Sequence, residues 1–238
     1  MKSINLSFSR NLIRTPDFSG FTRLEILGLV LCANLVGLHP SIGQLSKLKS
    51  LNLSHCKSLT NLPSLSAKME SLTSISLHGC SKIKKIPEIN GTMKSLSQLI
   101  LCWTAIEELP PLSIECLTAL EILDLEGCKD LKCLPSNMDS LRSLKFLHLS
   151  KCSKLANLTE NLWKIKCLEG LDLSGISQLE EIELNGIGCL SSLKYLSLSA
   201  YNVVTLPASF SQLSKLEALD LNYCMKLQSV SELPSTMR

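Results

Sequence analysis

The segment LEILDLEGCKDLKCLP, residues 120–135, contains a pattern that recurs along the whole chain. It reads L-x-x-L-x-L-x-x-C-x-x-L-x-x-L-P, where x is any residue. The pattern starts again every 23 to 25 residues, at Met1, Leu24, Leu48, Leu72, Leu96, Leu120, Leu144, Leu168, Leu193 and Leu216. An internal repeat of this period predicts a solenoid, in which each unit packs only against its neighbours.

The L-x-L alternation in each repeat predicts one short strand. Alternate side chains of a strand point to opposite faces, so two leucines enter the core and the residue between them faces outward. Strands that run in the same direction and are joined by long returns form a parallel sheet. We expect the strands to be centred on Asn5, Gly28, Asn52, Ser76, Ile100, Asp124, His148, Asp172, Ser197 and Asp220.

The period and the pattern are those of leucine-rich repeats. We therefore predict an α/β-type solenoid, a right-handed horseshoe of about ten repeats with a parallel β-sheet on its concave face. Return segments such as HPSIGQLSKLKS (39–50) begin at a proline and carry apolar residues three or four apart. They predict short helical or irregular structure on the convex face. Repeats five and nine are shortened, and their next apolar residues are Ile106 and Val203.

The repeat leaves no place for a second domain, so residues 1–238 are expected to form one leucine-rich-repeat solenoid. Neither end has the polar face that normally caps a solenoid. We therefore expect this domain to be a fragment of a longer polypeptide without its native caps.

Composition limits the classes of function. The net charge is +3 and neither half has the basic run expected of a nucleic-acid binder, so we expect no nucleic-acid partner. No apolar run approaches the roughly 18 residues that span a bilayer, so we expect no membrane contact. Six of the eleven cysteines occupy the ninth position of their repeats. On parallel strands their side chains run side by side, so we expect free, buried thiols that act as small apolar groups.

Three stretches, SRNLIRTPDFSG (9–20), HPSIGQLSKLKSLNLSHCKSLTNLP (39–63) and TAIEELP (104–110), resemble the leucine-rich-repeat region of plant intracellular immune receptors of the TIR-NB-LRR class. The resemblance implies a cytoplasmic or nuclear sensor in plant innate immunity, which recognises a pathogen effector or a guarded host protein. It also implies contact with the neighbouring nucleotide-binding domain of the same receptor. The chain lacks the G-x-x-x-x-G-K-[ST] phosphate loop, so we expect no cofactor and no enzyme activity.

Positions three, five, seven and eight of each repeat are expected to line the concave face. Exposed tryptophan and tyrosine often anchor protein interfaces. We predict a protein-binding surface with Trp103, Phe146, Tyr195 and Tyr223 as anchors, although Trp103 and Phe146 would also fit ordinary packing. The other predicted members are Ile100, His148, Lys151, Asp124, Asp172, Asp220, His78 and His55. A second apolar patch at the N-terminal end, predicted to contact an adjacent domain, contains Phe8, Ile26, Val30 and Leu31.

His78, Cys102 and Glu126 occupy position seven of consecutive repeats, and His55 is nearby at position eight. One interpretation is a Zn²⁺ site or a Cys–His nucleophile pair, because both need such groups close together. Ligands aligned along one flat column do not converge tetrahedrally, however. We therefore favour a polar binding surface and expect no metal.

Overall fold

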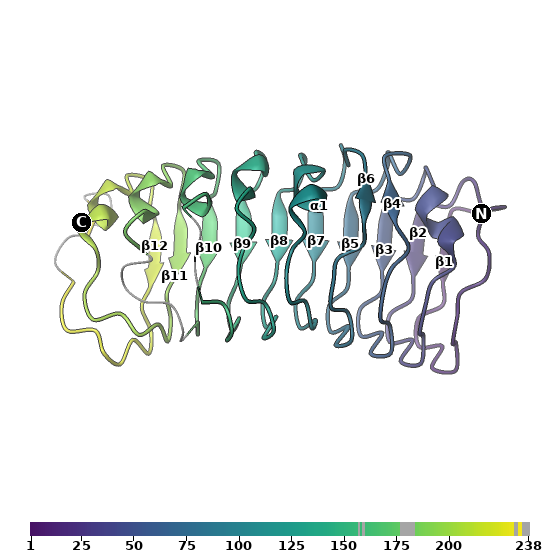
Figure 1. Ribbon diagram of the computed structural model, residues 1–238, viewed down its shortest axis with the longest axis horizontal. Helices are drawn as coiled ribbons and strands as arrows, with labels where there is room; N and C mark the ends of the chain where they lie inside the picture. Colours follow the sequence, from purple (N-terminus) through teal and green to yellow (C-terminus); the bar gives the residue numbers. More distant parts are fainter. Residues whose placement is uncertain (157, 159, 177–183, 231–232, 235–238) are drawn as a thin grey trace.

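The computed structural model describes residues 1–156, 158, 160–176, 184–230 and 233–234. Within them, one ten-stranded parallel sheet runs from end to end of the molecule (Figure 1). Its strands, in spatial order, are β1 (Ser3–Asn5), β2 (Ile26–Gly28), β3 (Ser50–Asn52), β5 (Ser74–Ser76), β7 (Gln98–Ile100), β8 (Ile122–Asp124), β9 (Phe146–His148), β10 (Gly170–Asp172), β11 (Tyr195–Ser197) and β12 (Ala218–Asp220). The predicted solenoid and its parallel sheet are confirmed.

The register joins equivalent positions of neighbouring repeats, as in the pairs Leu123 with Leu147 and Asp124 with His148. Each strand covers positions three to five, so its middle residue is the inward leucine or isoleucine at position four. The predicted strand centres therefore lie one residue too late. The strands end at position five because the chain turns immediately after that residue.

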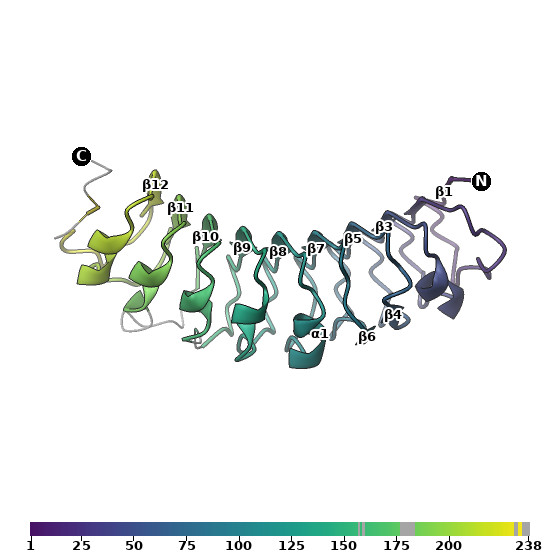
Figure 2. The same ribbon diagram turned by 90° about the horizontal axis from the view of Figure 1, so that it is seen from above.

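The convex side carries short helical elements and no long helix among the described residues. Figure 2 shows the strands along the inner edge of the arc and these elements along its outer edge. They are α1 (Pro111–Glu115) and the 3-10 helices η1 (Pro40–Gln44), η2 (Met138–Ser140), η3 (Leu162–Lys164), η5 (Ile187–Cys189) and η6 (Ala208–Gln212). A second, two-stranded parallel sheet joins β4 (Leu65–Ser66) to β6 (Ile89–Asn90), which the sequence analysis did not predict.

Inward-pointing leucines form the core as columns that cross all the repeats. In the sixth repeat, Leu120, Leu123 and Leu125 have no exposed surface. Ile106 and Val203 of the two shortened repeats are also fully buried, so each takes the place of a core leucine. A core of identical aliphatic layers explains why so few aromatic residues are needed.

All eleven cysteines are free thiols. Those at the ninth position do more than fill space, because each Sγ donates a hydrogen bond to a backbone carbonyl of the preceding repeat. Cys56 donates to Leu29 at 3.0 Å, and Cys152 donates to Leu125 at 3.1 Å. Burial raises the pKa of both thiols to about 12. The column therefore satisfies carbonyl groups that the narrow core would otherwise leave unpaired.

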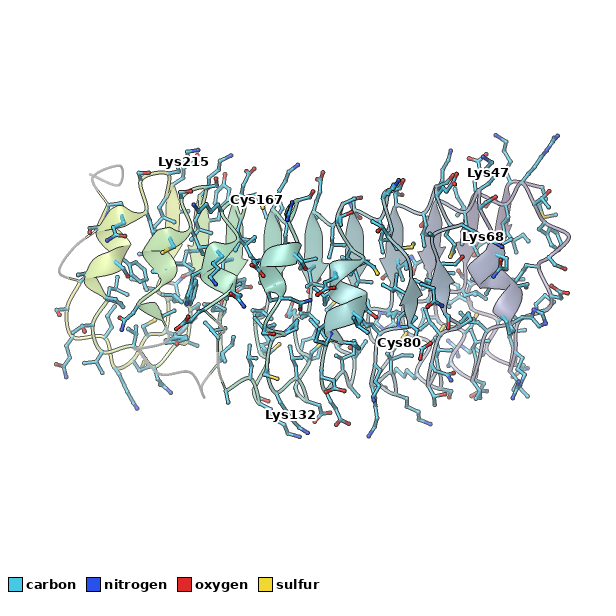
Figure 3. The ribbon with its side chains drawn as sticks, turned by 45° about the horizontal axis from the view of Figure 1, so that its top comes forward. Lys47, Lys68, Cys80, Lys132, Cys167 and Lys215 are labelled. Atoms are coloured by element: carbon cyan, nitrogen blue, oxygen red, sulfur yellow. The ribbon has the colours of Figure 1, made fainter. Side chains whose placement is uncertain are left out.

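Ion pairs line the edges of the arc. Glu25 accepts hydrogen bonds from Lys2 at 2.8 Å and Lys49 at 2.7 Å, which lower its pKa to about 2. Figure 3 shows Lys47 and Lys215 at the upper edge and Lys132 at the lower edge. Exposed pairs of this kind contribute little stability. Within the described residues, no helix is both long and apolar enough to span a lipid bilayer.

Candidate functional site

Position five of a repeat is the last residue of its strand, and its side chain often starts the turn. Oδ1 of Asp172 accepts a hydrogen bond from the backbone N–H of Ser174 at 2.9 Å. Equivalent bonds of 2.9 to 3.0 Å are accepted by Asn5, Asn52, Asp124 and Asp220. Asn and Asp stabilise turns in this way. The acidic column thus has a structural role that the sequence analysis missed.

Position eight has left-handed backbone in every one of the ten repeats, with φ between +56° and +71°. Only three of these residues are glycines; the others are Phe8, Leu31, His55, Trp103, Lys151, Ala200 and Tyr223. A left-handed conformation costs a side-chain-bearing residue roughly 1–2 kcal/mol. Hydrogen bonds between repeats stabilise this conformation. From Phe8 to Ala200, the backbone N–H of each position-eight residue donates to a backbone carbonyl of the next repeat, and Trp103 donates to Glu126 at 2.8 Å. Strain of this kind concentrates at functional sites.

Large side chains of this column lie across glycines of the next repeat. An added Cβ on Gly127 would come within 2.7 Å of the Trp103 ring, and one on Gly79 within 2.5 Å of the His55 ring. Large residues and glycines therefore alternate along the column from His55 to Gly175. The glycines provide the space into which the preceding ring leans.

Replacing Gly127 by alanine tests this arrangement. We expect Gly127→Ala to lower the free energy of unfolding by about 2 kcal/mol, because φ is +67° and the new methyl group meets the Trp103 ring. Gly175→Ala is the matched control: its φ is +68°, but its Cβ would lie 3.7 Å from Lys151, an ordinary contact. Urea unfolding followed by circular dichroism compares them. Equal losses in the two variants would show that the ring does not occupy this space.

Trp103 is the centre of a mixed aromatic and charged cluster. Its side chain is 38% exposed. The Nζ atoms of Lys151 and Lys129 lie 5.4 and 5.8 Å from the ring centroid, within the range of cation–π attraction. Lys151 also forms an ion pair with Glu126 at 2.6 Å. The indole is therefore partly covered by neighbouring side chains and keeps an exposed part.

A second feature is a shallow depression of ≈ 390 Å³ on the concave face of the last four repeats. At position three, aromatic and small residues alternate along it: Phe146, Gly170, Tyr195 and Ala218. The Phe146 ring lies over Gly170, where an added Cβ would be 2.6 Å from it. Tyr195 is 48% exposed, and its hydroxyl donates a hydrogen bond to Glu217 at 3.3 Å. Phe146 is partly packed, whereas Tyr195 remains open to solvent.

Polar residues at position five complete this depression. Ser174 donates its hydroxyl to Asp172 at 2.5 Å and shares a hydrogen bond with Ser197 at 2.7 Å. Ser197 in turn donates to Asp220 at 3.2 Å. His148 lines the same depression. The structure therefore brings together Phe146, His148, Asp172, Tyr195 and Asp220, all five of which the sequence analysis selected for the binding surface.

The other predicted concave residues lie outside this depression. Tyr223 is 79% exposed, whereas Ile100, Asp124, His78 and His55 are partly buried. Position seven differs from the expectation, because Cys102 and Ser150 are only 6% and 5% exposed. Other position-seven residues, such as His78 and Glu126, are only partly buried, so the burial is local to Cys102 and Ser150. In the N-terminal patch, Phe8 and Ile26 are 63% and 50% exposed, while Val30 and Leu31 are partly buried.

The histidine and cysteine side chains do meet, as their column predicts. His78 Nδ1 lies 2.8 Å from Cys102 Sγ, and the rings of His55 and His78 are 4.6 Å apart. Burial, and then the negative charge of Asp124, raises the pKa of the Cys102 thiol to about 12. A nucleophilic cysteine needs a lowered pKa. In the described part of the chain, no three His, Cys, Asp or Glu residues are placed to hold a metal ion.

Alkylation of the native protein at pH 8 tests this assignment. With a pKa of about 12, about one Cys102 in ten thousand is a thiolate at that pH, so iodoacetamide should leave it unmodified. The exposed Cys133 and Cys189 should react first. Peptide mass spectrometry reads the result, with urea-unfolded protein as the control in which every thiol reacts. Modification of Cys102 as fast as Cys133 would restore the nucleophile interpretation.

The repeat, the curved parallel sheet and the outward-facing side chains define a leucine-rich-repeat solenoid. The chain matches the family model "Disease resistance protein RPS4B-like, leucine-rich repeats" over residues 68–238 and a general leucine-rich-repeat model over residues 47–69. It belongs to the leucine-rich repeats of the RPS4B-like disease resistance proteins. It is thus a leucine-rich-repeat domain of the TIR-NB-LRR receptor class, and such domains typically serve as non-enzymatic protein-interaction modules.

Two curated relatives are plant proteins. TMV resistance protein N of Nicotiana glutinosa is 46% identical over 46 residues, which are 19% of this chain and 4% of that protein. Disease resistance-like protein DSC1 of Arabidopsis thaliana is 44% identical over 54 residues, 23% of this chain and 4% of that protein. Among solved structures, the leucine-rich-repeat domain of the type III effector XCV3220 (XopL) aligns with a TM-score of 0.56 at 23% identity, covering 92% of this chain and 75% of that one. This last likeness concerns the fold alone.

Proposed function

We propose that the concave face binds a partner protein, and that this binding is the effector-sensing step of a plant immune receptor. The partner is a pathogen effector or a host protein that the receptor guards. The observation that carries the proposal is the exposure of three aromatic side chains, Trp103, Tyr195 and Tyr223, of which Tyr195 lines the concave depression. Exposed aromatic anchors supply much contact area at a small entropic cost.

The strained backbone at position eight supports this proposal. Trp103 and Tyr223 adopt left-handed conformations that a glycine would adopt without cost. Large residues at such positions lower stability, so a function that uses the side chain accounts for their presence. The proposed module is non-enzymatic, needs no cofactor or metal, and works in the cytoplasm or the nucleus.

A second candidate function is an intramolecular contact that restrains the adjacent nucleotide-binding domain. The observation in its favour is the N-terminal patch, where Phe8 and Ile26 expose large apolar surfaces beside Val30 and Leu31. Apolar patches of this kind mark interaction sites. The two functions use different surfaces, so one receptor can have both.

Variants of the full-length receptor in plant tissue separate the two candidates. Tyr195→Ala should abolish capture of the partner and leave the uninfected plant without a response. Ile26→Asp should cause signalling without a pathogen, because a charge in the patch weakens the restraining contact. Partner capture by immunoprecipitation and cell death in uninfected leaves are the two measurements. Retention of the partner by Tyr195→Ala would contradict the first candidate, and silence of Ile26→Asp the second.

A further inference from the structure

The depression between Phe146 and Tyr195 has a composition that specifies one chemical class of occupant. We propose that it binds an arginine side chain of the partner protein. This inference rests on the proposed function, since it names the group that the concave face recognises. It is carried by three features of the site: aromatic walls, two carboxylates without an ion-pair partner, and the absence of lysine and arginine at positions three and five, where His148 is the one titratable base.

Two aromatic side chains, Phe146 and Tyr195, line the depression. Phe146 is held over Gly170, which has no side chain to fill the space. Tyr195 is the neighbour of Gly170 on the next strand, β11, and the small Ala218 is the neighbour of Tyr195 on β12. A guanidinium group stacks on aromatic faces by cation–π attraction, whereas an ammonium group is more strongly hydrated and stacks less well.

The carboxylates of Asp172 and Asp220 supply the negative charge. Both line the depression and both are partly buried. Their hydrogen bonds come from neutral donors, namely backbone N–H groups and the hydroxyls of Ser174 and Ser197. Among the described residues, no lysine or arginine forms an ion pair with either carboxylate; nearby lysines pair instead with Glu126 and Glu169. Lys151 is close enough for its charge to interact with Asp172, but its ion pair is with Glu126, so within the described residues neither carboxylate has a direct cationic partner.

The residues at positions three and five of the neighbouring repeats add no lysine or arginine to this negatively charged region. From the sixth to the tenth repeat, position three carries only neutral residues, and position five carries Asp124, Asp172 and Asp220 with no lysine or arginine. Partial burial lowers the local dielectric constant and strengthens attraction to a cation. A planar guanidinium can bond to a carboxylate with two N–H groups while its face contacts a ring.

The chain itself shows how to remove the charge without disturbing the fold. Asn5 and Asn52 accept the same backbone hydrogen bond at position five that Asp172 and Asp220 accept. Asn52 also accepts a hydrogen bond from the hydroxyl of Ser54 at 2.7 Å, as Asp172 does from Ser174. The double variant Asp172→Asn with Asp220→Asn should therefore keep both turns. Asp130→Asn is the matched control, because its carboxylate pairs with Lys154 outside the depression.

The test is selection of displayed random peptides on the 238-residue chain, followed by binding measurements with synthetic peptides. We expect enrichment of peptides with one invariant arginine. Replacing that arginine by citrulline, its uncharged analogue, should weaken binding to the wild-type chain and to Asp130→Asn about tenfold. The same replacement should have no effect on binding to the double asparagine variant, whose melting temperature should match that of the wild type.

Selected peptides without a basic preference, or an equal citrulline effect in the double variant, would overturn the proposal. So would the absence of any enriched peptide. Capture of the partner by the Tyr195→Ala receptor distinguishes failure of the arginine proposal from failure of the proposed function. If Tyr195→Ala still abolishes capture of the partner, the concave face binds protein but the depression takes an uncharged group. If capture is unaffected while the arginine preference holds, the depression is a cation site on a face that the partner does not use.

Discussion

Leu123→Ala is expected to lower the free energy of unfolding by about 2–5 kcal/mol, enough to unfold much of a marginally stable domain. Leu123 is fully buried in the middle of β8, between Leu99 and Leu147 of the neighbouring strands. Truncation leaves a cavity in a core of repeated layers, which cannot collapse locally without moving the adjacent repeats. Urea unfolding followed by circular dichroism measures the loss.

Ile122→Ala is the matched control for this prediction. Ile122 precedes Leu123 in the same strand, but it lies on the concave face and is partly exposed. Its truncation should cost about 1 kcal/mol or less, chiefly through strand propensity. The contrast between two adjacent residues tests the alternation on which the fold depends. Similar losses at both positions would mean that the strand is buried on both faces.

The second large effect concerns binding of the partner protein. Alanine at Trp103 or Tyr195 should weaken binding by about 2 kcal/mol or more, which is roughly thirtyfold in the dissociation constant. Both side chains combine a large apolar surface with an exposed part, and Trp103 also orders Lys151 and Lys129 around it. Surface plasmon resonance with the purified partner measures this change.

Leu112→Ala controls for the loss of any exposed apolar side chain. Leu112 is 78% exposed on α1, on the convex side. Its replacement should leave the dissociation constant within about twofold of the wild-type value, because residues outside an interface contribute little. A loss at Leu112 equal to that at Tyr195 would place the partner on the convex side.

Much of this fold could be predicted from the sequence, because position within the repeat determines burial. The spacing of leucines placed every strand of the main sheet to within one residue. The short β4–β6 sheet on the outer side could not be predicted in this way. It arises from contacts between return segments whose sequences differ from repeat to repeat.

The candidate site was predicted less completely. Tyr195, Asp172 and Asp220, which the repeat pattern assigned to the concave face, line one depression, and their role in binding stays a prediction. The left-handed turn at position eight was missed, although a signal for it exists, since Gly79, Gly127 and Gly175 recur there. The burial of Cys102 at position seven was also missed; its Sγ lies 2.8 Å from His78 Nδ1 of the preceding repeat.

The pairing of aromatic rings with glycines was also beyond the sequence analysis. It depends on residues one full repeat apart, such as Phe146 with Gly170 and Trp103 with Gly127. No local pattern joins them, because they meet only once the register of the sheet is known. Once the register is known, alternation of large and small residues along a column indicates that each large side chain lies over the small residue of the next repeat.

Hydroxyl-radical footprinting of the receptor with and without its partner reports side-chain exposure at each residue, and therefore which face the partner covers. If the exposed aromatic residues form the binding surface, partner binding should lower the oxidation of Trp103 and Tyr195 and leave that of Leu112 on α1 unchanged. Protection of Leu112 with undiminished oxidation of Trp103 and Tyr195 would contradict this prediction.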